Sequence, residues 1–348
     1  MRKALTILSV LTVLAACEKS FDISKQVGPG TVWMSFIPSN DYDTTYFMLQ
    51  ATTPLAGVTD PVMTRGESVE VRVNGQPLSL EKGRISFPDR IQSYLTDYRF
   101  MPGDVVEAVA TVPEAGSVSA SCEVPQPFPS YSWSMTMVQR RSTVYTMLVD
   151  IEYDGPQDGG YYGAAVIQHS ESDSQWENTD PETGEKNWGD VHHSSATHGL
   201  SPSPMSDTDG LSAQSEEPVS VSPEYYNTLS GNYYRAQIWH DTPSSGNGRR
   251  KKTIALRCYE QPARQDFTGN EYKGWEEYQY TYKLVLYRFS ESCYNYLKAK
   301  YNDEHNEFAA MGLAPASFVY TNVRGGAGVC GAYTVKESEW TDSPGGSD

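Results

Sequence analysis

Basic side chains are scarce in this chain of 348 residues, where 27 lysines and arginines stand against 44 aspartates and glutamates for a formal net charge of −17. Nucleic-acid partners require clustered Lys and Arg that contact phosphates. The composition therefore argues against nucleic acid and against adhesion to anionic headgroups, and it favours a soluble body. The one basic cluster, residues 249–252, follows a Ser- and Gly-rich stretch and is interpreted as a solvated hairpin tip.

The chain also has no apolar run that is long enough to cross a membrane as a helix. The first run, Ala4–Val13, is shorter than the roughly 20 apolar residues that a spanning helix needs, and no later segment approaches that length. It follows a basic start, Arg2-Lys3, and ends in the small residues that precede Cys17. A basic start, a short apolar run and small residues before a cleavage point form the pattern of a secretory signal peptide.

Small residues directly before a cysteine resemble a lipobox, in which the thiol receives a diacylglycerol and becomes the first residue after cleavage. We therefore expect residues 1–16 to be a lipoprotein signal peptide and residues 17–30 to be a lipid anchor and tether. Two or three acyl chains, palmitate among them, exceed what stable anchoring needs, so the membrane would be reached through Cys17 alone. The alternatives are an ordinary cleaved signal with a chance cysteine and an uncleaved anchor.

Motifs for nucleophilic and zinc-dependent catalysis are missing. The sequence has no GxSxG elbow and no HExxH pair, and no cysteine has a predictable histidine partner. Carboxylates are abundant, which leaves a glycosidase pair as an alternative, but abundance does not place two of them together. We expect a protein that is not an enzyme and that holds no cofactor.

One glycine motif resembles a dinucleotide site. Residues Gly326–Gly331 spell GxGxxG after a strand-like segment. A dinucleotide site also needs a following helix, whose N–H groups and dipole meet the pyrophosphate. Here the strand-like residues Tyr333–Val335 follow instead, so the glycines are interpreted as a corner between two strands, Ser317–Val323 and Val329–Val335.

Two polar patterns suggest metal ligands only weakly. Residues Asp207–Gly210 with Glu216 match part of a calcium loop, but Met205 stands at its first ligand position. The histidines of the same polar region could bind zinc together with Asp190; they are His192, His193 and His198. Solvated side chains are the more common reading of both patterns, and we predict no metal site.

Four cysteines follow Cys17, namely Cys122, Cys258, Cys293 and Cys330. Exported proteins permit disulfides, and four cysteines allow three pairings. Cys122 and Cys258 alternate with apolar neighbours, as core-facing residues do, and a buried free cysteine behaves as a small hydrophobe. Buried thiols are therefore favoured, with the disulfide pairing left open.

The mature chain is predicted to be mainly β, with two β-sandwich-like domains. Val69, Val71 and Val73 alternate before the hairpin signal Asn74-Gly75, and Val105–Val112 is another candidate strand. Many short strands between Gly and Pro turns indicate a sandwich. We place an N-terminal Ig-like or transthyretin-like domain at residues 31–125, a stiff proline-rich boundary at 125–129, and a C-terminal β domain at 130–340.

The C-terminal domain is expected to carry one short helix and one long polar loop. The helix begins beside the capping residue Ser290 and aligns Cys293, Leu297 and Tyr301 on one face. Residues 170–218 are too polar to form a core and too long for an ordinary connection, so they are predicted to be an excursion.

Paired tyrosines are the remaining signal for binding, because each pair places one ring on either face of a strand. Exposed rings could stack on a sugar or line a peptide groove. The alternative is that one ring packs in the core and the other shields the outer face. The pairs are Tyr161-Tyr162, Tyr225-Tyr226 and Tyr233-Tyr234.

Three stretches together resemble a Bacteroidota lipoprotein family catalogued as domain of unknown function 4249. These are Cys17–Ile23 after the signal, the module of Val69–Asn74 with its Pro102–Asp104 turn, and the end of the chain from Leu284 through Phe318–Tyr333. The resemblance spans nearly the whole mature chain except the polar excursion. The chain departs from the family pattern by having Cys330 where an aromatic residue is usual.

The resemblance implies an outer-membrane lipoprotein that is often encoded beside TonB-dependent receptors and has no established activity. Cys17 is the only functional position that it transfers. We expect a ligand-binding or accessory partner of a TonB-dependent transporter, on the cell surface rather than the periplasmic face. The alternatives are a surface adhesin or envelope structural protein and, third, an enzyme acting on glycans or peptides.

Overall fold

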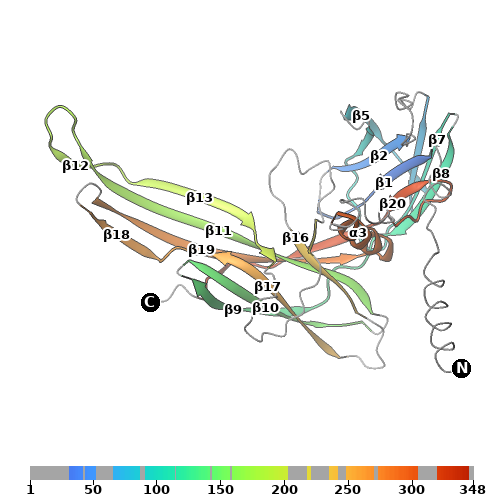
Figure 1. Cartoon of the computed structure of the whole chain (residues 1–348). Coiled ribbons are helices and arrows are strands. Elements are labelled where there is room, and N and C mark those ends of the chain that lie inside the picture. The colour runs from blue at the N-terminus through green and yellow to red at the C-terminus, as the bar shows by residue number, and fades with distance from the viewer. Residues whose placement is uncertain are drawn as a thin grey trace, which may run out of the picture.

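The computed structural model describes residues 31–41, 44–51, 66–86, 91–113, 115–141, 143–156, 159–202, 218–220, 235–241, 248–269, 273–304 and 320–344. The prediction of a mainly β protein is confirmed, because strands make up most of these residues and α3 (Glu291–Glu304) covers one of the sheets. Figure 1 shows two sandwiches, with α3 near their junction and a long arm of strands that extends away from it. Cys17 and the expected signal peptide and tether, residues 1–30, lie outside the described residues.

The first sandwich packs a five-stranded sheet on a four-stranded sheet. The five-stranded sheet has the order β20-β1-β2-β6-β5; its strands are β1 (Val32–Phe36), β2 (Thr45–Ala51), β5 (Glu81–Ser86), β6 (Ile91–Thr96) and β20 (Ala327–Cys330). The other sheet has the order β4-β3-β7-β8; its strands are β3 (Ser68–Val73), β4 (Gln76–Leu78), β7 (Val105–Val112) and β8 (Gly116–Glu123).

Alternation explains the core of this sandwich. Along β7 every second residue is buried, and the inward side chains meet those of the facing sheet in one apolar cluster. The predicted hairpin is also confirmed: Asn74 and Gly75 have φ of 52° and 77°, as a two-residue turn with both φ positive requires. They connect β3 to β4 in register.

The strand β20 comes from the far end of the chain. It pairs in parallel with β1, from Trp33 with Ala327 to Phe36 with Cys330. The first sheet thus includes residues from within the range expected for the second domain. The predicted strand Ser317–Val323 is wrong for its described part, because residues 320–323 form no strand; the side chain of Asn322 instead holds the backbone N–H and C=O of Cys330.

The second sandwich packs a short sheet on a long one. The short sheet has the order β14-β17-β10-β9; its strands are β9 (Tyr131–Arg141), β10 (Val144–Asp154), β14 (Ser201–Pro202) and β17 (Arg249–Tyr259). The long sheet contains the main path β15-β16-β11-β19-β18; these strands are β11 (Gly160–Thr179), β15 (Pro218–Ser220), β16 (Arg235–Asp241), β18 (Arg264–Thr268) and β19 (Lys273–Phe289).

Four further strands extend the long sheet. They are β12 (Lys186–Trp188), β13 (His192–Gly199), β21 (Tyr333–Glu337) and β22 (Thr341–Asp342). One face of this sheet packs on the short sheet. Its other face forms a separate apolar cluster with α3, whose residues Cys293 and Leu297 are buried there as predicted; the side chain of Tyr301 lies outside the described part.

The described part of the polar segment 170–218, residues 170–202 and 218, departs from the prediction of a loop. Residues 170–179 continue β11, and β13 pairs with it from Ile167 with Gly199 to Ser174 with His192. Almost all of β13 is exposed. The arm is held by backbone pairing of β11 with β13 and β19 rather than by a core, and for this reason its sequence shows little apolar periodicity.

The basic residues 249–252 also differ from the prediction of a hairpin tip. They begin β17, which pairs with β10. Three of them form ion pairs with carboxylates: Arg249 with Glu152, Arg250 with Asp241, and Lys251 with Asp150. The cluster therefore neutralises acidic neighbours within the sandwich.

The proline-rich segment 125–129 connects the two cores. Val124 is buried in the first cluster and Phe128 in the second. Lys336 donates hydrogen bonds to the carbonyl oxygens of Phe128 and Pro129, and Thr334 donates to that of Gln126. These contacts tie the connection to β21.

Candidate functional site

A cleft of about 770 Å³ lies where the two sandwiches meet. Its walls come from the end of β8 and the segment after it, from the starts of β11 and α3, and from the ends of β16 and β19. The described residues that line it are Cys122, Glu123, Pro125, Gln126, Gly159, Gly160, Tyr161, His240, Arg288, Phe289, Ser290, Glu291, Ser292 and Tyr320. Ligand sites often form at such junctions.

Aromatic rings form a stack along one wall. The ring of Tyr161 lies 4.4 Å from that of His240 in a stacked arrangement and 4.9 Å from that of Tyr294. Burial and the charge of Glu291, which also accepts its hydrogen bond, raise the pKa of Tyr161. Its phenol therefore stays protonated at neutral pH, while the exposed His240 ends the stack.

Successive side chains along β11 point to opposite faces of the sheet, so only one ring of the Tyr161-Tyr162 pair can reach a ligand in the cleft. Tyr162 points to the other face of β11 and is completely buried in the second core. Tyr161 points to the cleft. The prediction of one ring on each face is confirmed for this pair, whereas Tyr225-Tyr226 and Tyr233-Tyr234 lie outside the described residues.

Arg288 lines the cleft from β19, on the face of the sheet opposite to Tyr161. It is paired with Tyr162 across β19 and β11, and its guanidinium lies 6.0 Å from the centre of that ring. No carboxylate among the described residues forms an ion pair with it. A guanidinium without a carboxylate partner can donate hydrogen bonds to a ligand oxygen.

The start of α3 adds hydroxyl and carboxylate groups. Ser290 caps the helix as predicted: its Oγ accepts hydrogen bonds from the N–H of Cys293, at 3.2 Å, and of Ala332, at 2.9 Å. Glu291 lies in the first turn, where the helix dipole favours a negative charge. Hydroxyl groups and a carboxylate therefore lie beside the aromatic stack.

The cleft chemistry suits binding better than nucleophilic attack. Cys122 is the thiol that lines it, and contact with the Cys330 thiol together with burial raises the pKa of Cys122 well above its ordinary value. A protonated thiol is a poor nucleophile. The polar and charged groups instead match the pattern of an apolar wall with a few placed hydrogen-bonding groups.

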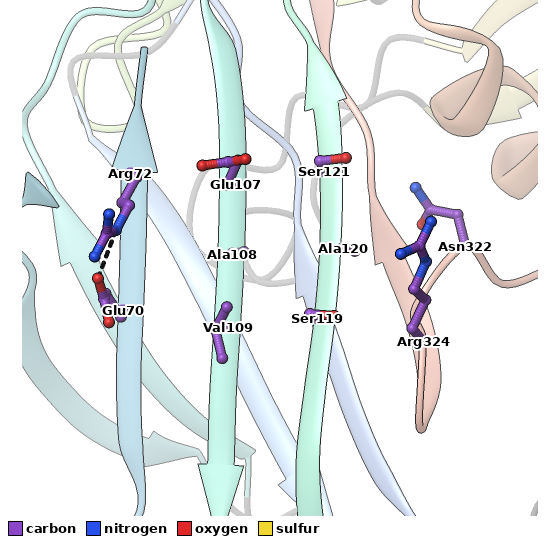
Figure 2. Close-up of a pocket in the computed structure, with 10 residues that line it drawn as sticks. All are labelled: Glu70, Arg72, Glu107, Ala108, Val109, Ser119, Ala120, Ser121, Asn322 and Arg324. Atoms are coloured by element: carbon purple, nitrogen blue, oxygen red, sulfur yellow. Dashed lines mark hydrogen bonds and ion pairs between the residues drawn. The ribbon is translucent and has the colours of Figure 1, made fainter. Parts of the chain in front are cut away.

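A second hollow, of about 530 Å³, lies on the outer face of the sheet β3-β7-β8 (Figure 2). Its lining includes short side chains of β8, Ser119 and Ser121. Figure 2 shows Arg72 paired with Glu70 on one side, with Nε and Oε1 2.6 Å apart, and Arg324 on the other side. Arg324 also lacks an ion-pair partner within the described ranges. Because no aromatic ring lines this hollow, we take the cleft as the candidate site.

The histidines that could have held zinc lie on the exposed strand β13. His193 contacts the carboxylate of Asp173 on β11, while His192 and His198 pair with other β11 positions. In the part of the chain that the structure describes, no three His, Cys, Asp or Glu side chains form a group that could hold a metal ion. The partial calcium loop, residues 205–216, lies outside the described residues.

The glycines of Gly326–Gly331 serve close packing between strands. Gly328 has a φ of +109°, and a Cβ there would lie 1.8 Å from the carbonyl oxygen of Met34. Gly331 lies against the backbone of Cys293 at the corner between β20 and β21. A strand follows the motif, as the sequence predicted.

Sequence reasoning missed most of the cleft residues. Arg288 could have been identified as a candidate from the sequence, because it is the one charged residue in the apolar run of residues 284–289. His240 and Glu123 left none, since their meeting depends on the packing of two sandwiches. Cys330, Cys258 and Cys293 are buried free thiols as predicted, whereas Cys122 is only partly buried.

Comparison with known proteins gives a family but no characterised relative. A search of curated proteins found no significant match. Among the described residues, no helix combines the length and apolar character needed to cross a membrane. The model of a domain of unknown function, DUF4249, matches residues 19–339, nearly the whole chain, and the protein therefore belongs to this family.

Proposed function

We propose that this protein is a lipid-anchored outer-membrane protein that binds a small hydroxyl-rich ligand, such as a mono- or oligosaccharide, as the accessory partner of a TonB-dependent transporter. The observation that carries the proposal is the cleft between the sandwiches. Its aromatic stack ends in the exposed His240, and Arg288 has no ion pair among the described residues. The function is binding rather than catalysis.

The balance of charge in the cleft supports a neutral polar ligand. The lining includes the basic side chains of Arg288 and His240 as well as Glu123 and Glu291, together with the hydroxyls of several residues. Sugars present apolar ring faces and many hydroxyls, which aromatic rings and paired donors and acceptors recognise. A strongly charged ligand would meet a like charge on one wall.

A binding assay with two variants tests the ligand part of the proposal. Mature protein is titrated by calorimetry with a panel of mono- and oligosaccharides. Arg288→Ala should weaken binding about tenfold or more, since a hydrogen bond to a charged group is worth about 1.5–3 kcal/mol. Arg324→Ala, which removes the arginine of the second hollow, is the matched control and should leave affinity unchanged. Equal losses in both variants would contradict the assignment of the cleft.

The anchor is tested separately. Cys17 is expected to carry the lipid, so Cys17→Ala should move the protein from the membrane to the soluble fraction and abolish labelling by a palmitate analogue. Tagged wild-type protein, solubilised in detergent, should bring down a TonB-dependent receptor. Membrane retention of Cys17→Ala would exclude lipid anchoring as the attachment, and capture without any receptor would count against the transporter role.

The long arm favours a second candidate, a surface adhesin or envelope structural protein. The arm exposes β13 and the ring of Trp188, which is 48% exposed, and Figure 1 shows it extending far from the first sandwich. Protease treatment of intact cells distinguishes the two ideas in part. An arm that proteases cannot reach from outside is incompatible with adhesion.

A further inference from the structure

Two thiols meet at the edge of the first sandwich. Cys122 lies near the end of β8, and Cys330 is the last residue of β20. Their Sγ atoms are 3.4 Å apart. β8 and β20 belong to different sheets, so this contact joins the edge of one sheet to the edge of the other.

The backbone on both sides of the contact is well held. Cys122 is paired with Val106 in the sheet β3-β7-β8, and Cys330 is paired with Phe36. The Asn322 side chain accepts a hydrogen bond from the N–H of Cys330 at 2.9 Å and donates one to its carbonyl oxygen at 2.8 Å. The proximity of the two sulfurs therefore follows from strand pairing and not from a loose chain end.

We propose that Cys122 and Cys330 form a disulfide bond whenever the protein meets a disulfide oxidant. A disulfide has an S–S distance of about 2.0 Å, so the sulfurs must approach by about 1.4 Å. Rotation about a Cα–Cβ bond moves a sulfur atom while the backbone stays in place, so the approach we propose is a movement of the two side chains.

The reaction balances with an oxidant of the thiol–disulfide class, either an oxidised dithiol oxidoreductase or oxidised glutathione. The Cys122 thiolate attacks one sulfur of the oxidant, which releases one oxidant thiol after a proton is taken up. The Cys330 sulfur then attacks the mixed disulfide at Cys122, forms the Cys122–Cys330 bond and releases the second oxidant thiol. Two protons and two electrons leave the cysteines, and the oxidant is reduced to two thiols.

Exposure sets the order of these two attacks. Cys122 is partly exposed and lines the cleft, whereas Cys330 is fully buried. An oxidant can therefore reach Cys122 first. Because the raised pKa of Cys122 leaves little thiolate at neutral pH, the rate of oxidation should increase as the pH rises.

The other two cysteines have different surroundings. Cys258 lies in the second core, where its Sγ contacts the Tyr282 hydroxyl at 3.1 Å and the Gln168 amide at 3.3 Å. Cys293 is buried on α3 against the Gly331 backbone. Neither has a sulfur of another described residue within hydrogen-bonding distance. Cys293 is near enough to Cys122 to contribute to the raised pKa of that thiol, so Cys258 is the internal control.

The test is peptide mapping of the full wild-type chain before and after incubation with oxidised glutathione. Digestion without reductant should yield one peptide pair linked through Cys122 and Cys330, and denatured protein should lose two reactive thiols to a maleimide reagent. Cys258→Ala should preserve the linked pair, and Cys122→Ala should abolish it. Absence of the linked pair from wild-type protein, or a dominant link through Cys293, would overturn the proposal. Mapping of wild-type protein does not depend on whether any variant folds.

Discussion

Replacing Gly328 by alanine should destabilise the first sandwich far more than an ordinary glycine substitution. The backbone at Gly328 has a φ of +109°, which L residues rarely adopt, and the new Cβ would lie 1.8 Å from the carbonyl oxygen of Met34. Met34 is the residue with which Gly328 pairs across β1 and β20. The clash is with backbone, so relief requires β20 to move away from β1.

A second glycine separates the cost of backbone strain from the cost of the clash with Met34. Gly116 has a nearly equal φ of +104°, but no atom lies within 4 Å of a Cβ built there. Gly116→Ala should therefore cost only the conformational strain, about 1–3 kcal/mol. Gly328→Ala should add the loss of about two backbone hydrogen bonds, each about 1 kcal/mol. Exposure of Val329, which is completely buried, should add about 1.5–3 kcal/mol.

The measurement is thermal unfolding of both variants, followed by calorimetry and by tryptophan fluorescence, to which Trp33 on β1 contributes. Gly328→Ala should be about 3.5–5 kcal/mol less stable than Gly116→Ala, the sum of those losses. One kcal/mol shifts the melting temperature of a domain of about 100 residues, the size of the first sandwich, by about 4–8 °C. Equal melting temperatures for the two variants would refute the parallel pairing of β20 with β1 as described.

Three further predictions concern the second sandwich, and urea unfolding measures each. Asp241→Ala should cost about 3–5 kcal/mol, because it breaks the largely buried ion pair between its carboxylate and the guanidinium of Arg250, which are 3.0 Å apart; a loss below 1 kcal/mol would contradict this. Tyr162→Ala should cost about 3–5 kcal/mol, and Tyr161→Ala clearly less, since only Tyr162 is in the core. Burial opposes ionisation of Asp150, but hydrogen bonds from a lysine and a threonine hold its pKa below the ordinary value. Asp150→Asn should therefore cost at most about 1 kcal/mol of stability at pH 7. The difference in stability between variant and wild type should vanish as the pH falls through that lowered pKa.

Local signals in the sequence predicted the local structure well. Alternating valines identified β3 and β7 with their observed bounds, and Asn74-Gly75 identified the hairpin. The cap at Ser290 identified the start of α3. Each of these features depends on residues that are close in sequence, so a short stretch of sequence includes all the side chains that determine it.

The arm could not be predicted by the same reasoning. Strand prediction relies on one apolar face, and residues 192–199 have none because both faces of β13 are largely exposed. Backbone pairing with β11 makes this segment a strand. The sequence alone does not show which strand a polar segment will pair with.

The cleft shows the same limit at longer range. The sequence pattern pointed to Tyr161. His240 and Arg288 become part of the cleft only through the pairing of β11 with β16 and β19. The contact between Cys122 and Cys330 joins positions 208 residues apart. Such meetings follow from topology, which no local pattern contains.

The strand β20 lies near the end of the chain, so it is synthesised long after β1, the strand with which it pairs. A chain that emerges from its amino end presents β1 long before the strand that completes its sheet, so the edge of β1 stays open during most of synthesis. Open edges invite pairing with other chains. Products that terminate before residue 327 should keep that edge and aggregate, while the finished chain covers it, which makes completion of the polypeptide a condition for solubility.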